Sequence, residues 1–323
     1  MMVDLVFCLF LVCPSGGAGG SWRSVVLAAD QLAAQSTRSG CFYFRKENQF
    51  FNWRADQTKP VDVPVSPYWL YRQSGDHLVA FHYRDPDPIR VADPAGKTWS
   101  IACPKGGPTL AADWAETCLY HLNQQGQRLT FRRLDELGNT LAETAFDLGR
   151  DLEIDLAYSF FLDGLWHVWC PRICRIWVLD PDLQVVSSIR VKLPQSILEF
   201  DPSVMDPFFE WPGEQLESYC QKMHGALMAV FTGNFFKEDN HYVLLYQLGR
   251  LNGCMKGVTI DLGFKTHAFF VDVSGEIDAE TVFPDSVYFR FGTGQDLVGF
   301  YDEGQPPPHH HRVHQLHRWS GLK

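Results

Sequence analysis

Residues 159–191 read SFFLDGLWHVWCPRICRIWVLDPDLQVVSSIRV, and this stretch decides the fold. Its side chains alternate, with Leu165, His167 and Trp169 on one face of an extended chain and the residues between them on the other. A period of two predicts β-strands. Apolar residues occur on both faces, which predicts a sheet that is covered on both sides.

Three short turns divide this stretch, at Asp163-Gly164, Pro171-Arg172 and Pro181-Asp182. Each contains residues that tolerate or fix turn geometry. Connections this short can only join antiparallel neighbours. The stretch therefore predicts a four-stranded meander with strands at Tyr158–Phe161, Leu165–Cys170, Arg175–Asp180 and Gln184–Lys192.

The turn between the third and fourth predicted strands recurs along the chain. Apolar alternating runs flank Asp93 with Gly96, Asp135 with Gly138, and Asp180 with Leu183 in the place of the glycine. The three aspartates are 42 and 45 residues apart. Second strands can be placed before each turn, so the meander is one copy of a repeated unit.

A repeat of about 40–47 residues with four strands is typical of propeller blades. The chain resembles the β-propeller superfamily over roughly residues 22–301. The resemblance extends to the architecture only, because the chain has neither the Gly-His and Trp-Asp pairs of WD40 repeats nor a kelch signature. The alternative is a large β-sandwich, which would not readily explain equally spaced turns of the same chemistry.

We therefore predict an all-β protein, a β-propeller of six four-stranded blades, although the length also permits seven. The expected blades are 22–65, 67–103, 108–147, 155–192, 196–262 and 267–301. The fifth is longer than the others and contains an insertion at 198–225. Its second half has apolar residues at helical spacing, so one helical insertion is expected in the fifth blade.

Both ends of the chain give further predictions. We expect residues 1–303 to form a single propeller domain, in which a strand at 3–12 closes the last blade. The alternative for 3–12 is a signal peptide, but Asp4 is the only early charge. Residues 304–323 are expected to form a Pro/His-rich C-terminal tail, with a short helix after its prolines.

The histidines of this tail suggest a second property. In a helix, His310, His314 and His317 would share one face, a spacing that can bind transition metals. We nevertheless expect no metal and no other cofactor in the function of the protein.

Charge and cysteine usage limit the possible partners. The net charge is −10, and an acidic protein lacks the basic surface that nucleic acids and anionic membranes require. We expect neither as a partner. The chain has nine cysteines, an odd number, and is long enough to be stable without disulfides. This favours reduced thiols and a cytoplasmic location. A Cys170–Cys174 disulfide across one turn is the alternative.

Motifs that carry chemistry are not evident in the sequence. Gly96-Lys97-Thr98 resembles the end of a phosphate-binding loop, but Val91 stands where the first glycine is required, and the context is strand–turn–strand. His167, Cys170 and Cys174 could supply metal ligands, but strand alternation directs His167 and Cys170 to opposite faces. We therefore predict no catalytic residues and a core role for these three.

The insertion is the candidate partner-binding segment. It combines acidic side chains with large aromatic ones, as interface hot spots often do. The residues expected to bind a partner are Asp201, Asp206, Phe208, Phe209, Glu210 and Trp211. The alternative is a packed loop that shields an apolar patch.

Two functions of different classes remain. The first is a non-catalytic protein-interaction scaffold or adaptor in a multi-protein assembly, with a basic or amphipathic protein partner. The second is a propeller enzyme, a hydrolase or lyase, with its site at the mouth of the central channel. Residues of such a site come from different blades and leave no local motif. Carboxylates, His or Arg converging at the channel would favour the enzyme, and an apolar plug would favour the scaffold.

Overall fold

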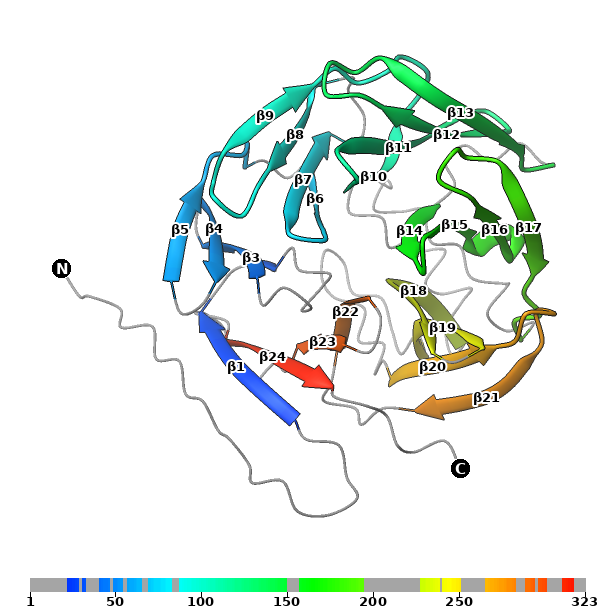
Figure 1. The fold of residues 1–323 in the computed structure, drawn as a ribbon. Helices are drawn as coiled ribbons and strands as arrows, with labels where there is room; N and C mark the ends of the chain where they lie inside the picture. Colours follow the sequence, from blue (N-terminus) through cyan, green and yellow to red (C-terminus); the bar gives the residue numbers. More distant parts are fainter. Residues whose placement is uncertain are drawn as a thin grey trace, which may run out of the picture.

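The chain folds into a ring of six blades around a central axis (Figure 1). The computed structural model describes residues 22–28, 31–32, 41–46, 49–54, 57–65, 69–82, 87–149, 157–194, 227–238, 240–250, 265–282, 288–293, 296–300 and 310–316. Each blade is a four-stranded sheet, and every strand pairing is antiparallel. This confirms the predicted β-propeller with six four-stranded blades.

The first five blades each use four consecutive strands. Blade 1 contains β2 (Gln31–Leu32), β3 (Cys41–Lys46), β4 (Gln49–Arg54) and β5 (Gln57–Val61). Blade 2 contains β6 (Trp69–Ser74), β7 (His77–His82), β8 (Ile89–Ala92) and β9 (Thr98–Ile101). Blade 3 contains β10 (Thr109–Ala115), β11 (Cys118–Gln125), β12 (Arg128–Leu134) and β13 (Thr140–Asp147). Blade 4 contains β14 (Tyr158–Leu162), β15 (Leu165–Cys170), β16 (Arg175–Leu179) and β17 (Val185–Arg190).

The last two blades divide the chain differently from the sequence prediction. Blade 5 contains β18 (Leu227–Glu238), β19 (His241–Arg250), β20 (Lys265–Val271) and β21 (Ile277–Val282). Blade 6 contains β22 (Tyr288–Thr293), β23 (Asp296–Phe300), β24 (His310–Leu316) and β1 (Trp22–Ala28), in that order from the centre outward. The prediction that a sixth blade begins near residue 267 is wrong, because β20 pairs with β19. Blade 5 takes up more chain because β18 and β19 have 12 and 10 residues.

The strand β1 lies at the outer edge of the last blade. β1 pairs with β24 from Trp22↔Leu316 to Ala28↔His310. The position beside the last blade is thus held by 22–28, which was predicted to open the first blade. The predicted closing strand at 3–12 lies outside the described residues, as does the predicted helical insertion at 198–225.

The predicted C-terminal tail also needs correction. Residues 310–316 form the strand β24 and not a helix, so the predicted domain boundary before residue 304 is wrong. The physical reason is pairing, since β24 has backbone partners in β1 on one side and β23 on the other. Among the described residues the only helix is the three-residue 3-10 turn η1 (Pro171–Ile173), and none is long enough to cross a bilayer.

The predicted turns occupy equivalent places in successive blades. Asp93, Asp135 and Asp180 each start the hairpin between the third and fourth strand. In each, the aspartate backbone exchanges hydrogen bonds with the following residues, and its Oδ1 accepts two more backbone N–H bonds at 2.8–3.0 Å. Asp272 makes the same turn in blade 5, which the sequence analysis missed.

The fourth residue of this turn has a positive φ in all four blades. Glycine is suited to this conformation, and it also permits close approach to the preceding blade. A Cβ on Gly138 would lie 2.8 Å from the Ala102 carbonyl oxygen, and one on Gly275 would lie 2.0 Å from that of Arg190. Leu183 takes this place in blade 4 with φ +62° and is buried. The turns therefore join each blade to the blade before it.

The core lies between blades and is rich in large aromatic side chains. Phe131 and Tyr120 of blade 3 pack on Trp166 of blade 4, and Phe160 of blade 4 stacks on Phe235 of blade 5. Flat side chains of this kind fill the wedge between two twisted sheets and bury much apolar surface. His167, Cys170 and Cys174 are all buried here, as predicted, and no disulfide joins Cys170 to Cys174.

Candidate functional site: the central channel

The first strands of the blades surround the ring axis (Figure 1). Arg72 on β6, Asp113 on β10 and Phe160 on β14 occupy the same position in three successive blades. Each lies three residues before the first residue of the hairpin turn that follows. Because equivalent positions on innermost strands approach the axis together, these side chains meet.

Arg72 and Asp113 form a buried ion pair. Arg72 Nε lies 2.8 Å from Asp113 Oδ1, and the two side chains are only 9% and 4% exposed. Arg72 Nη2 also donates to the main-chain oxygen of Ser159 in blade 4, and the Ser159 hydroxyl donates to Asp113 Oδ2. The Arg72 guanidinium lies over the Phe160 ring, 5.0 Å from its centroid. Arg72 thus reaches from blade 2 past blade 3 to blade 4, which is possible only near the axis.

The electrostatics of this cluster follow from its burial. Burial raises the pKa of the Asp113 carboxyl and lowers the pKa of the Arg72 guanidinium, and the attraction between the two charges opposes both shifts. With a contact of 2.8 Å and the Ser159 hydroxyl bond, we assign both groups their charged forms at neutral pH. The ion pair and the hydrogen bonds with Ser159 join three blades.

A second polar cluster lies on blade 3. His121 Nε2 is 3.0 Å from Thr109 Oγ1 and 3.7 Å from Cys103 Sγ. Burial lowers the pKa of His121 to about 3, and nearby Arg132 adds to this effect; burial also raises the pKa of the Cys103 thiol. Both groups are therefore neutral at pH 7. A nucleophilic cysteine requires a thiolate, so this arrangement does not support covalent catalysis.

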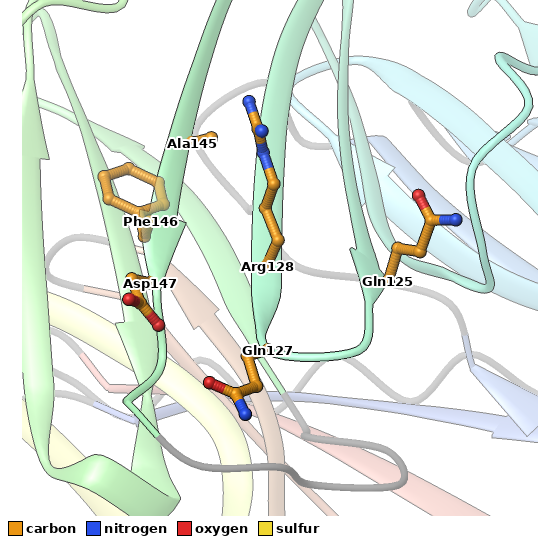
Figure 2. A pocket seen from close by; sticks show the side chains of 6 residues that line it. All are labelled: Gln125, Gln127, Arg128, Ala145, Phe146 and Asp147. Atoms are coloured by element: carbon orange, nitrogen blue, oxygen red, sulfur yellow. The ribbon is translucent and has the colours of Figure 1, made fainter.

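A surface depression of about 510 Å³ lies at the β11–β12 turn and the end of β13. Its lining residues are Gln125, Gln127, Arg128, Ala145, Phe146 and Asp147. Figure 2 shows that the Gln125, Arg128 and Asp147 side chains point in different directions and do not converge. Within the described part of the chain, no three His, Cys, Asp or Glu side chains are grouped to hold a metal ion.

The partner-binding residues predicted from the sequence remain a prediction. Asp201, Asp206, Phe208, Phe209, Glu210 and Trp211 all lie outside the described residues. The channel cluster, in turn, was not found from the sequence, because Arg72, Asp113 and Ser159 lie on three separate strands with no local motif. An alignment of the blades at their first hairpin turn would have placed Arg72 and Asp113 at one equivalent position.

Comparison with known proteins gives the fold. No family model matches the chain, and no curated protein sequence matches it. Among solved structures, virginiamycin B lyase from Staphylococcus aureus is similar with a TM-score of 0.50 and 9% identity over 93% of this chain and 100% of that chain.

Two further structures are similar at lower TM-scores. A chain of the Mitotic Checkpoint Complex has a TM-score of 0.47 and 8% identity over 98% of this chain and 99% of its own. The WD40 domain of Toxoplasma gondii coronin has a TM-score of 0.38 and 13% identity over 92% of this chain and 76% of its own. At 9% identity the lyase bears on the fold alone, and the two structures with TM-scores below 0.5 add no argument. The chain has the β-propeller fold.

Proposed function

We propose that this protein is a non-catalytic interaction scaffold, an adaptor subunit of a multi-protein assembly. The observation that carries the proposal is the closed Arg72–Asp113–Ser159 cluster at the ring axis. Catalytic acids and bases must reach the substrate, whereas these side chains are buried and hydrogen-bonded among themselves. A ring with such a centre offers its outer surfaces for recognition.

The alternative is a hydrolase or lyase with its site at the channel mouth. Arg and Asp do converge at the axis, which is the feature that an enzyme would need. Their burial speaks against it, because a buried ion pair whose groups satisfy one another is a structural element and not an open acid–base pair. The scaffold accounts better for the arrangement.

The test replaces both charges at once, as Arg72→Met with Asp113→Leu. Replacing both members of a buried pair by apolar residues of similar volume is often tolerated, whereas single replacements leave one charge unpaired. In the native host, with the endogenous copy removed, the folded double variant is expected to restore the wild-type phenotype. Cross-linking mass spectrometry should recover the same partners as for the wild type.

A folded double variant that recovers the partners but does not restore the phenotype would place chemistry at the channel and refute the scaffold. Circular dichroism and a melting curve establish that the variant is folded. The double variant Lys59→Ala with Asp62→Ala serves as the mutational control, since it removes one exposed charge of each sign at the outer strand β5 of blade 1, far from the axis.

A further inference from the structure

The exposed apolar side chains gather on one part of the rim. Three segments there each contain the Asp turn and outer strand of a blade: 135–147 in blade 3, 180–190 in blade 4 and 272–282 in blade 5. We call these segments the rim arc. All the large hydrophobic side chains found exposed in the described residues belong to it, namely Leu137, Leu141, Val185, Val186, Val273 and Val282. Figure 1 shows β13, β17 and β21 following one another along the rim.

The rim arc is also acidic. Its three segments contain ten Asp and Glu residues and one basic residue, Arg190 at the end of β17. Four cations from outside the segments pair with its carboxylates: Arg128 and Arg132 with Glu143, Arg133 with Asp182, and Lys192 with Glu276. His241 and His267 contact Asp278 and Glu280. The corresponding segment of blade 2, residues 93–101, has one acidic and one basic residue. The combination of apolar and acidic groups is therefore specific to blades 3 to 5 among those compared.

β17 lies in the middle of this arc and has an open edge. Among the strands that the structure describes, it is the outermost of its sheet and pairs only with β16. Proteins usually protect such edges with charged residues. β13 has Glu143 and Asp147, and β21 has Asp278 and Glu280, but the first five residues of β17 are uncharged. Four of them in succession, 185–188, are exposed, and Val186 is 55% exposed.

We propose that β17 accepts an extended segment of a partner protein as a fifth strand, and that this segment combines apolar with basic side chains. The inference rests on the proposed scaffold function and names the surface and the partner chemistry. Strand addition satisfies the free backbone groups of the edge. Apolar side chains of the added segment cover Val185 and Val186, and its basic side chains meet the carboxylates on either side. Electrostatic complementarity then selects the partner.

Binding of a labelled synthetic peptide to the full chain tests this surface. The peptide has six residues in which valine and lysine alternate, matching the six residues of β17. Two comparison peptides carry glutamate in place of lysine, or proline in place of valine. We expect fluorescence anisotropy to show affinity at least about tenfold higher for the first peptide. Hydrogen exchange should slow at the β17 amides.

Val186→Lys places a charge on the open edge and should weaken binding by about tenfold or more. Val186 is half exposed, so the variant is expected to melt like the wild type. Ala95→Lys is the control for the added charge, because Ala95 is exposed in the Asp turn of blade 2, away from β17, and it should bind like the wild type. Equal binding by Val186→Lys, or by the proline peptide, overturns strand addition at β17.

The experiments distinguish a failure of strand addition at β17 from a failure of the proposed scaffold function. If Val186→Lys retains the cross-linked partners of the wild type, β17 is not the docking edge while the scaffold function stands. If the channel double variant fails to restore the phenotype although the valine–lysine peptide protects β17, the scaffold function falls and the edge remains a binding surface.

Discussion

Leu183 allows the packing between blades 3 and 4 to be measured against backbone strain. It stands where blades 2, 3 and 5 have glycine, and its φ of +62° is unfavourable for a leucine. A left-handed conformation costs a non-glycine residue roughly 1–2 kcal/mol. From the repeat alone, Leu183→Gly should therefore stabilise the protein.

The structure predicts the opposite. The Leu183 side chain is 1% exposed and packs in the core between blades 3 and 4. Truncation of a buried leucine costs about 2–5 kcal/mol. After relief of the strain, Leu183→Gly should lower the free energy of unfolding by about 2–3 kcal/mol.

Leu183→Ala separates the two contributions. It loses nearly the same packing but keeps the strain, so it should be less stable than Leu183→Gly by about 1 kcal/mol. Urea unfolding followed by tryptophan fluorescence gives the three free energies. A Leu183→Gly variant as stable as the wild type, or an alanine variant more stable than the glycine variant, would refute this account of the turn.

Three further predictions concern the pH dependence, the channel and the closure of the ring. Burial lowers the pKa of His121 to about 3 and of His167 to about 4, from 6.5. Below pH 6.5 the unfolded chain therefore binds protons that the folded chain does not. Urea titrations should show that the free energy of unfolding falls by about 2 kcal/mol per histidine between pH 7 and pH 5. His167→Phe should remove about half of the combined loss from the two histidines. Arg72→Met or Asp113→Leu alone should cost about 3–5 kcal/mol in the same assay, and the double variant much less than the sum, so additive losses would contradict the ion pair. Replacing Val25 and Val26 by proline should lower the melting temperature sharply, since β1 then loses backbone bonds to β24; an unchanged melting curve would exclude β1 from the ring.

The sequence predicts the blades that keep a constant period, and the reason lies in the turns. Asp93, Asp135 and Asp180 each combine a side-chain acceptor with a fourth residue at positive φ, and this chemistry is local enough to recognise. The turn at Asp272 has the same chemistry but was missed, because it lies 92 residues after Asp180 instead of one period. Most of the difference comes from the 36 residues between β17 and β18 and the 14 residues between β19 and β20. Constant spacing is informative only where strand and loop lengths are constant.

The closure of the ring and its centre depend on contacts that no local pattern encodes. β1 lies directly before blade 1 in the sequence, so it was assigned to that blade, but its pairing partner is β24. The alternation of residues 22–28 identifies a strand and gives no information on its neighbour. Arg72 and Asp113 are 41 residues apart and meet only because successive blades rotate about one axis.

The pairing of β1 with β24 also has a consequence for synthesis of the protein. β1 leaves the ribosome before any other described strand, and β24 leaves it last. During translation at about 5–20 residues per second, the first strand must wait for some tens of seconds without its partner. Throughout that time the chain has an unpaired strand at each end of an incomplete ring. A chain released before residue 310 cannot pair β1 with β24, so the ring closes only after β24 has been translated.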